Sequence, residues 1–348
     1  MITFFRGPVL RGWRVRGLWC YIVRMTRMAT LLCCLPLASA CASTSSNRPL
    51  ASPPGHSPVD SSLRILVDAP ISYSVPEDGT ERKIHTPMVR ARVGNVETLL
   101  ILDTGATDPI FTVAFADAIG VAYQQTGDGT DHADASVATF AGTSPLNLFI
   151  GDYQYTVSSP LFIEGPPPFE GWGVGGFLSP QLLHDHAWIE MDLQDNRLRI
   201  IRGSEPAVTQ AVRSQHPELH GSGPLSRLRE EGDAARLAIV EARLDNRDRI
   251  RVMFNTGGRH TELAPSTQPE PAAEGQVATG RGVSGEAVMG THSTRSTVLQ
   301  LGPTEVPLEA FVVREQGPAY EGQLGIDVLL GTVLLLRADS STNAYWWH

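Results

Sequence analysis

The hydrophobic and polar positions of the chain form one pattern that occurs twice, an apolar run closed by a short polar turn. The first run covers residues 99–102 and ends in Asp103-Thr104-Gly105-Ala106. The second covers residues 250–254, interrupted only by Arg251, and ends in Asn255-Thr256-Gly257-Gly258. A continuous apolar run is typical of a buried strand, and glycine permits the sharp turn that must follow it. We therefore predict two buried strands that each end in a tight loop.

A second pair of landmarks follows these loops at similar distances. Gly176 lies 73 residues after Asp103, and Gly322 lies 67 residues after Asn255. Internal repetition on this scale indicates two similar structural units in one chain. Each glycine is followed in turn by an apolar, strand-like run, at residues 187–193 and 332–336.

The rest of the chain predicts an all-β fold, because its segments are short, β-branched and bounded by turns. A single short helix is expected at residues 114–119. Ser and Pro dominate the stretch before the first lobe, a composition typical of a disordered tether. We divide the chain into an export signal at 1–41, the tether at 42–62, lobe 1 at 63–203, an interlobe linker at 204–233 and lobe 2 at 234–348.

Composition and charge exclude some classes of partner. The chain is 42% hydrophobic and 19% charged, as expected of a globular protein, and 348 residues suffice for two small domains. It carries 28 basic and 37 acidic residues, and six of the basic ones lie in the first 41 residues, which contain no acid. The remainder is therefore strongly acidic, which argues against binding of nucleic acid or of an anionic lipid surface.

The N-terminal segment resembles a bacterial export signal. Met25 or Met28 offers a start alternative to Met1, an apolar stretch follows, and Ala38-Ser39-Ala40 is a small-residue cleavage site. Cys41 comes next, as in a lipobox, so we expect lipid on Cys41 and a membrane-anchored envelope lipoprotein. Secretion into the periplasm or medium after cleavage at Ala40 is the alternative. All four cysteines lie within the first 41 residues, so the folded part has no disulfide framework.

The repeated turn has a chemical logic. Two loops of this kind that face each other would bring two polar side chains within a few ångströms. Two carboxyl groups at that distance share one proton, which leaves one carboxylate as a base. Such a pair can activate water and protonate a leaving amine. A lone Asp-Thr-Gly is a weak signal, since Asp and Gly are ordinary turn residues; the repeated landmarks strengthen it.

On these residues the chain resembles the retropepsin and pepsin group of aspartic peptidases. The motif of that group, an apolar pair followed by Asp-Thr-Gly-Ala and later by Gly-x-Leu-Gly-x-Asp-x-Leu, is matched fully at 103–106 and 322–329 and more loosely at 176–179. The resemblance covers roughly residues 85–340. It implies an all-β fold of two retropepsin-like lobes related by a pseudo-twofold axis with a cleft between them. It also implies that Thr104 and Thr256 brace the two loops by cross-lobe hydrogen bonds.

The second loop departs from the family pattern at Asn255, where the resemblance implies Asp. An amide cannot ionise, act as a base or share an acidic proton. The candidate catalytic residues are therefore Asp103, with Thr104 and Gly105, and Asn255 in the place of the second Asp, with Thr256 and Gly257. General acid–base catalysis is worth roughly 10²–10⁴-fold, and we expect most of it to be lost.

The resemblance places a flap hairpin over the cleft in each lobe, at residues 128–134 and 280–285. We expect no cofactor and no metal. Two groups of potential metal ligands are interpreted as a solvated loop and a surface turn: Asp128, Asp131, His132 and Asp134, and His184, Asp185 and His186.

Three functions remain open at this point. The first is an aspartic endopeptidase that uses Asp103 alone or pairs it with the Asp103 of a second molecule. The second is a catalytically inactive pseudopeptidase, a monomer that binds extended peptides in the cleft by strand addition. The third is a purely structural envelope lipoprotein. The expected partners are thus a peptide or protein in the cleft and a membrane through Cys41; peptide specificity is not encoded in any motif.

Overall fold

The fold was analysed in a computed structural model of the chain. It describes residues 63–77, 80–221, 223–228, 236–245, 248–267, 276–282, 284–293, 296–316, 319–338 and 343–348, which all fall within one compact unit. The proposed export signal, Cys41 and the proposed tether all lie outside these residues. Within the described residues, no helix combines the length and the apolar character needed to cross a bilayer.

Lobe 1 is a β structure with two short helices. The first helix begins after Thr112, whose hydroxyl accepts a hydrogen bond from Phe115 N at 3.1 Å and so caps the helix. The elements are β1 (Arg64–Glu77), β2 (Thr80–Val93), β3 (Val96–Leu102), β4 (Ile110–Thr112), α1 (Val113–Ala118), β5 (Tyr123–Thr130), β6 (Ser136–Gly142), β7 (Leu146–Ile150), β8 (Tyr153–Val157), β9 (Leu161–Ile163), α2 (Pro167–Trp172), β10 (Val174–Leu178), η1 (Pro180–Leu182), β11 (Trp188–Asp192) and β12 (Arg197–Arg202).

The second half of the chain is also mainly β structure. Its first helix, α3 (Glu205–Gln215), falls within the segment expected to link the lobes. The further elements are β13 (Ile239–Leu244), β14 (Asp248–Phe254), β15 (Glu262–Leu263), η3 (Pro265–Thr267), β16 (Val277–Arg281), β17 (Ala287–His292), β18 (Thr297–Leu301), β19 (Thr304–Leu308), β20 (Val312–Val313), β21 (Gly322–Leu324), α4 (Ile326–Leu329), β22 (Val333–Arg337) and β23 (Tyr345–Trp347).

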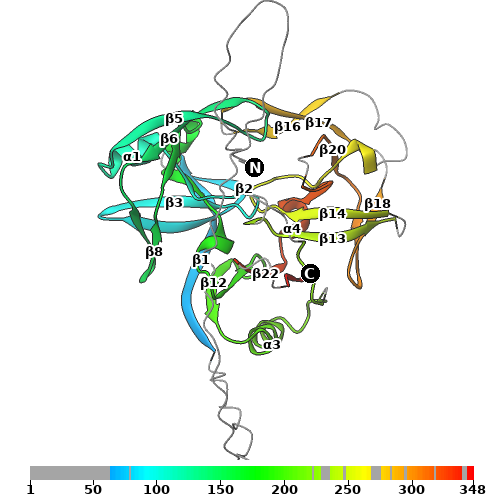
Figure 1. The fold of residues 1–348 in the computed structure, drawn as a ribbon. Coiled ribbons are helices and arrows are strands. Elements are labelled where there is room, and N and C mark those ends of the chain that lie inside the picture. Colours follow the sequence, from blue (N-terminus) through cyan, green and yellow to red (C-terminus); the bar gives the residue numbers. More distant parts are fainter. Residues whose placement is uncertain are drawn as a thin grey trace, which may run out of the picture. The chain divides into compact units, whose positions relative to one another are not determined.

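The two lobes pair their strands in the same order and in the same directions (Figure 1). In lobe 1, β3 is antiparallel to β2 and parallel to β10, which continues through β4, β9 and β6 to β5. In lobe 2, β14 is antiparallel to β13 and parallel to β21, which continues through β15, β20 and β17 to β16. The β7–β8 and β18–β19 hairpins attach at equivalent places, to β2 and to β13. The internal repeat in the sequence is therefore a repeat of topology.

The repeated glycine of lobe 1 has a clear steric reason. Gly176 has a φ of +152°, and a Cβ atom there would lie 2.2 Å from Ile110 O. Strand β10 runs between β3 and β4, and only a residue without a side chain lets β4 approach this closely.

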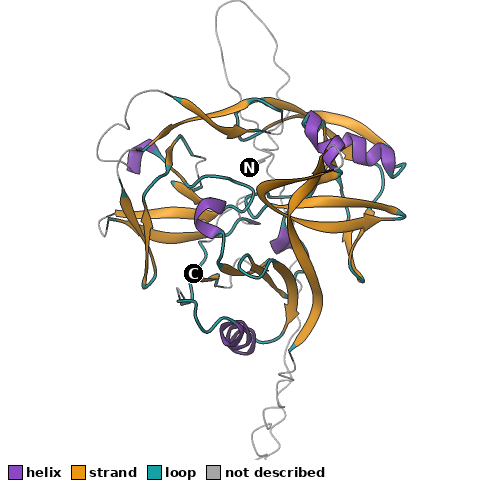
Figure 2. Ribbon diagram, turned by 180° about the vertical axis from the view of Figure 1, so that it is seen from behind, coloured by secondary structure: helices purple, strands orange, loops and turns teal. Residues whose placement is uncertain are grey.

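The C-terminal strands of the two lobes join in a sheet that lies between them (Figure 2). Strand β11 of lobe 1 pairs antiparallel with β22 of lobe 2, and β12 and β23 flank this pair on either side. An antiparallel pair of equivalent strands is the arrangement that a twofold axis through the pair produces. The first part of β1 adds to this sheet beside β12.

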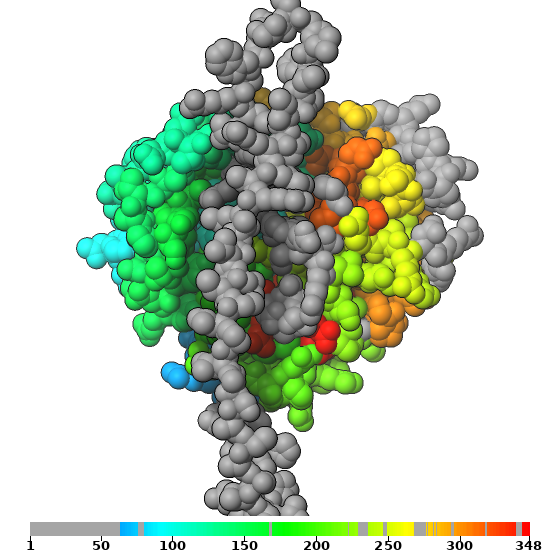
Figure 3. All heavy atoms as spheres, viewed as in Figure 1, coloured from blue at the N-terminus to red at the C-terminus, as the bar shows by residue number. Residues whose placement is uncertain are grey.

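One hydrophobic cluster runs through both lobes and the shared sheet. It includes Phe111 and Phe162 from lobe 1, Phe254 and Phe311 from lobe 2, and Trp346 from the C-terminal strand. In the space-filling view the two lobes lie on opposite sides, with C-terminal residues, in red, between them (Figure 3). Because apolar side chains pack continuously from one lobe to the other, burial of apolar surface holds the lobes together.

The all-β fold of two repeated lobes expected from the sequence is confirmed. The helix expected at 114–119 is α1, and the strand-like runs at 187–193 and 332–336 are β11 and β22. The hairpins expected as flaps are β5–β6 and β16–β17.

Candidate functional site

The candidate site is formed by the two polar loops, which end equivalent strands and face each other. Asp103 N donates to Leu178 O at 2.9 Å, and Asn255 N donates to Leu324 O at 2.9 Å. Each loop is thus held by the strand that contains the repeated glycine of its own lobe, β10 or β21. Both Asp103 and Asn255 are buried.

The two threonines brace the loops across the lobes in a reciprocal arrangement. Thr104 Oγ1 donates to Phe254 O, and Thr256 Oγ1 donates to Leu102 O, both at 2.7 Å. The same hydroxyls accept from the opposite backbone, with Thr104 N to Thr256 Oγ1 at 3.1 Å and Thr256 N to Thr104 Oγ1 at 3.0 Å. All four bonds link backbone of one lobe to a side chain of the other, so they fix the separation of the loops.

The carboxyl group of Asp103 and the amide of Asn255 lie close together. A Cβ atom built on Gly105 would lie 2.7 Å from Asn255 Oδ1 and 3.1 Å from Asp103 Oδ1. The two oxygens are therefore no farther apart than the sum of these distances. A Cβ atom on Gly257 would lie 2.3 Å from Asp103 Cγ. Glycine is required at both positions because each side chain occupies the space beside the opposite glycine.

The amide of Asn255 has a fixed orientation. Its Oδ1 accepts hydrogen bonds from Gly257 N at 3.1 Å and from Gly258 N at 3.0 Å. Asp103 Oδ1 accepts the equivalent bond from Gly105 N at 2.8 Å. Two backbone N–H groups can face only an acceptor, so the amide nitrogen must point the other way.

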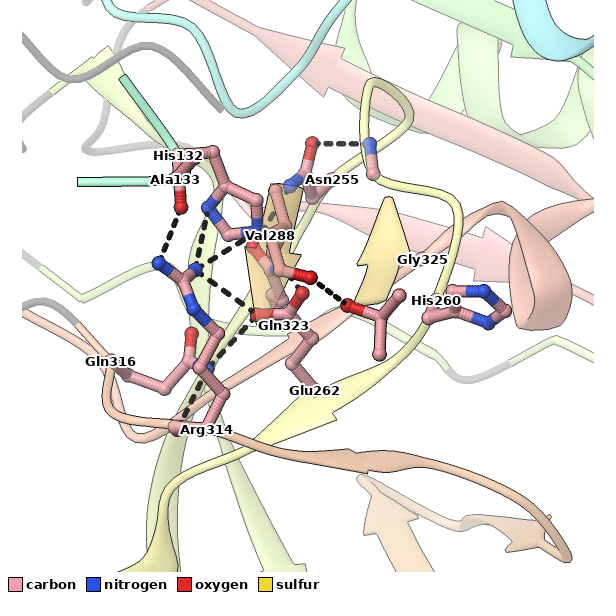
Figure 4. Close-up of polar contacts among 12 residues, drawn as sticks. His132, Ala133, Asn255, His260, Glu262, Val288, Arg314, Gln316, Gln323 and Gly325 are labelled. Carbon is pink, nitrogen blue, oxygen red and sulfur yellow. Dashed lines mark hydrogen bonds and ion pairs between the residues drawn. The ribbon is translucent and has the colours of Figure 1, made fainter. Parts of the chain in front are cut away.

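Gln323 holds that nitrogen in place (Figure 4). Asn255 Nδ2 donates to Gln323 Oε1 at 2.8 Å, and both side chains are fully buried. Gln323 Nε2 has no hydrogen-bond partner among the described residues. The amide at the second position is thus matched by a second amide in the neighbouring strand, rather than being an isolated replacement for a carboxyl group.

The equivalent positions of lobe 1 are apolar. Phe177 of β10 stands beside Ile110 of β4, and both belong to an apolar cluster. In the same register of lobe 2, Gln323 of β21 stands beside Glu262 of β15. Lobe 2 therefore carries polar side chains where lobe 1 carries hydrophobic ones.

The short segments after β10 and β21 secure the loops from behind. In lobe 2, the carboxylate of Asp327 accepts from Thr261 N at 2.9 Å and from Thr261 Oγ1 at 2.8 Å. In lobe 1, Gln181 takes the equivalent place, and its Nε2 donates to Thr104 O at 3.2 Å. Asp327 thus binds the residue that precedes β15, whereas Gln181 binds the Asp103 loop itself, so the two copies of the segment make different contacts.

The tips of the two hairpins meet across the lobes. Asp131 lies in the turn between β5 and β6, and its Oδ2 accepts from Ser284 N at 2.9 Å and from Ser284 Oγ at 2.7 Å. Its Oδ1 accepts from Ala133 N and Ala135 N within its own turn. These bonds hold the pKa of the Asp131 carboxyl below its usual value against the opposing effect of burial, which is the largest single influence.

The neighbouring residue of the same turn reaches into lobe 2 (Figure 4). His132 Nε2 lies 3.0 Å from Glu262 Oε1. Arg314, which follows β20, contacts the His132 ring at 3.0 Å and pairs with Asp134 at 2.9 Å. Gln316 Nε2 donates to Glu262 Oε2 at 3.2 Å. The turn interpreted from the sequence as a solvated loop is instead packed against the opposite lobe.

Burial and charge act on the titration of this cluster. Burial lowers the pKa of His132 below its ordinary value, although the Glu262 carboxylate beside it acts in the opposite direction. For Glu262, burial raises the pKa, but hydrogen bonds from His132 and Gln316 and the charge of Arg314 outweigh it, so the pKa is lowered. Neutral imidazole and ionised carboxylate are thus the favoured forms in this arrangement.

A second buried polar cluster lies between the shared sheet and α3, away from the loops. The ligand atoms of Glu190, Asp192 and His216 lie within 4.8 Å of one another. Arg199 Nη1 donates to Glu190 Oε1 at 3.0 Å, and Arg199 Nη2 lies 3.8 Å from Asp192 Oδ2. Because the guanidinium supplies positive charge between the carboxylates, we interpret the cluster as a buried ion-pair network.

The structure brings together all six site residues named from the sequence: Asp103, Thr104, Gly105, Asn255, Thr256 and Gly257. It does not bring the other histidine segment to them, because His184 stacks on Tyr153 and contacts Arg202. Sequence reasoning missed Gln323, Glu262 and Arg314. A usable signal existed only for Gln323, which stands at the variable position of the Gly-x-Leu-Gly motif where the first repeat has Phe177.

Comparison with known proteins adds little to this geometry. No protein-family model matches the chain, and no curated protein sequence matches it. Among solved structures, the crystal structure of basic 7S globulin from soybean matches with 12% sequence identity and a TM-score of 0.42. The match covers 81% of this chain and 94% of the globulin chain. A likeness at this level says nothing about function.

Proposed function

We propose that this protein is an aspartic-peptidase-like pseudopeptidase that binds extended peptides between its lobes without hydrolysing them. The interlobe cleft is defined here as the region between the paired loops and the paired hairpins. The observation that carries the proposal is the bond from Asn255 Nδ2 to Gln323 Oε1 at 2.8 Å. It fixes the Asn255 amide in an orientation matched to Gln323, and an amide cannot act as a general acid or base.

The chemical consequence follows from the side chains of Asp103 and Asn255. Hydrolysis by a carboxyl pair needs one ionised group to activate water and one protonated group to protonate the product amine. Asp103 can supply only one of these at a time. The Asn255 side chain uses its oxygen for two backbone N–H groups and donates from its nitrogen to Gln323, so it does not supply the other. The loop geometry is thus retained while the acid–base partner is absent.

Extended peptide is the ligand class that the hairpins favour. Among the described strands, β5 ends the sheet path of lobe 1 and β16 ends that of lobe 2, and both belong to the hairpins whose tips meet. Edge strands offer backbone donors and acceptors to an added strand, which supplies affinity without side-chain chemistry. An endopeptidase is the rival function, favoured by the intact loop at Asp103.

Photo-crosslinking tests the proposal. Mixed decapeptides that carry a photoreactive residue would be irradiated with the full chain, and the adducts would be located by mass spectrometry. We expect intact peptides bound to residues 123–142 and 277–292, and fewer adducts in the presence of excess unlabelled peptide. Adducts spread over the whole surface, or none, would contradict a peptide-binding cleft.

We also propose that Cys41, which lies outside the described residues, anchors the protein to a bacterial membrane through lipid. The support is its position directly after the small-residue cleavage site. Cys41→Ser should move the protein from the membrane fraction to the soluble fraction. Retention of this variant in the membrane fraction would place the anchor elsewhere.

A further inference from the structure

We propose that the hairpin turn of lobe 1 is an ionic latch that holds the interlobe cleft closed in the ligand-free protein and that acid opens. The latch consists of Asp131 and His132 from lobe 1 and of Ser284, Glu262 and Arg314 from lobe 2. The inference deepens the proposed function and rests on it, because only a ligand-binding cleft needs an entrance that opens and closes.

The latch makes two groups of contacts across the lobes. At the tip, the Asp131 carboxylate accepts from both the backbone and the hydroxyl of Ser284. Behind the tip, the His132 imidazole lies between Glu262, at 3.0 Å, and Arg314, at 3.0 Å. Arg314 also binds the backbone oxygen of His132. One turn of five residues between β5 and β6 thus holds partners on three separate segments of lobe 2.

The latch contacts include charged groups, whereas the threonine bonds and the apolar cluster that also hold the lobes together do not. The loops are braced by Thr104 and Thr256 through uncharged bonds to backbone, and a continuous apolar cluster joins the lobes. Neither responds to pH. The hairpin, by contrast, is anchored at its base within its own lobe, where residues 139–141 of β6 pair with β9. Loss of the polar contacts at its tip would therefore free the tip without unfolding either lobe.

The tip also fits its partner closely. A Cβ atom on Gly282, beside Ser284, would lie 2.0 Å from Asp131 Oδ2. Glycine at this position lets the backbone of the second hairpin come against the carboxylate of the first, which favours a specific closed position. Such a close fit is expected of hairpin tips that have one defined closed position.

The direction of the pH response follows from the groups that face His132. Glu262 and Arg314 contact His132 directly, Asp134 pairs with Arg314, and the charge of Glu262 also acts on Tyr320. In the closed state, burial lowers the pKa of His132 below its ordinary value, and the nearby charge of Arg314 acts in the same direction. An open, hydrated His132 binds a proton more readily, so the closed state is favoured above the open-state pKa, and this preference is lost as the pH falls from that value through the closed-state pKa.

Glu262 acts in the same direction at lower pH. Burial alone would raise the pKa of Glu262 in the closed state. The contacts with His132, Gln316 and Arg314 outweigh burial and lower that pKa. A lowered carboxyl pKa contributes stability above its open-state value, and that contribution is lost as the pH falls through the closed-state value. Acid therefore weakens the latch first at His132 and then at Glu262.

Distance measurement between the hairpins tests the latch directly. In the full chain with its four cysteines replaced by Ser, spin labels would be attached to Asp128→Cys and Glu286→Cys, both at exposed positions near the two tips. We expect one short inter-label distance at pH 7.5 and a shift to longer distances at pH 5. Glu262→Gln and Ser284→Ala should each shift the distribution to longer values at pH 7.5.

His132→Gln separates titration from mere contact, because Gln can still hydrogen-bond Glu262 but does not titrate. It should lose the response between pH 7 and 5 while keeping a response at lower pH. His85→Gln, at an exposed histidine of the same lobe, is the matched control and should behave as the parent. Unchanged distances from pH 7.5 to 4 in the parent protein would overturn the latch.

Peptide binding to the same samples separates the two proposals. If the distances respond to pH and to the latch variants but no peptide is captured in either state, the latch stands and the peptide-binding function fails. If peptide is captured while the distances never change, the function stands and the latch is wrong.

Discussion

The polar loops of the two lobes share one backbone design and differ in their chemistry. In lobe 1 the loop carries Asp103 beside the apolar pair Phe177 and Ile110, and in lobe 2 it carries Asn255 beside Gln323 and Glu262. The bonds that build the loops are nonetheless reciprocal, from the threonines to the glycine N–H groups. The comparison teaches that backbone and hydroxyl contacts preserve this site, whereas the ionisable groups can change without disturbing it.

The largest expected effect comes from removing the chemical difference between the loops. Asn255→Asp combined with Gln323→Phe gives lobe 2 the residues that lobe 1 has at these positions. Two facing carboxyl groups would then share a proton, which supplies both a base and an acid. We expect peptidase activity at acidic pH to rise by about 10²–10⁴-fold, measured by cleavage of fluorogenic peptides.

The matched control adds Asp103→Asn in the same background and should abolish that gain. Activity that survives this control would have to come from groups outside the two loops. Absence of any gain in a folded double variant would show that the loops differ in more than these two side chains.

A smaller effect tests how closely the loops face each other. Gly257→Ala places a methyl group against the Asp103 carboxyl, where a Cβ atom would lie 2.3 Å from Cγ. We expect a loss of about 1–3 kcal/mol in the free energy of unfolding, the usual cost of overpacking, measured by urea denaturation. Gly280→Ala is the control, because a Cβ atom there has no neighbour within 4 Å. Equal stability of the two variants would contradict the facing arrangement.

The smallest effect concerns the cross-lobe bonds. Thr104→Val and Thr256→Val each remove a hydroxyl that makes two hydrogen bonds with the backbone of the opposite lobe, one as donor and one as acceptor. Each variant should therefore lose about 1–2 kcal/mol of unfolding free energy. Because the arrangement is reciprocal, the two losses should be similar in size. Thr143→Val, at an exposed hydroxyl bonded to Ala122 O within lobe 1, should cost less. A clear inequality between Thr104 and Thr256 would show that one lobe dominates the brace.

The sequence predicted the features that depend on local pattern. The apolar runs before Asp103 and Asn255, the glycine landmarks and the strands after them are encoded within a few residues, and the structure places them in equivalent positions. The resemblance to aspartic peptidases supplied the roles of Thr104 and Thr256, which the hydrogen bonds of both residues match.

Apart from the threonine bonds, the sequence could not predict the contacts between the lobes. The residues that meet at the hairpin tips, Asp131 and Ser284, are 153 positions apart, and neither belongs to a motif. The run around His132 was interpreted as a solvated loop from its polar composition, yet Asp131 is buried there. Its burial is caused by the opposite lobe, which a local pattern does not record. The contrast between Gln323 and Phe177 at the variable position of the motif marked Gln323 as unusual, but it did not identify Asn255 as its partner.

The most direct test of the central claim is whether the wild-type protein cleaves peptides through Asp103. Wild type and Asp103→Asn would be incubated with a mixed peptide library from pH 3 to 7, at dilutions where the protein is a monomer, and the products would be identified by mass spectrometry. The account predicts intact peptides and no difference between the two proteins. Cleavage by the wild type that is lost in Asp103→Asn would contradict it, because one carboxylate would then suffice beside the Asn255 amide.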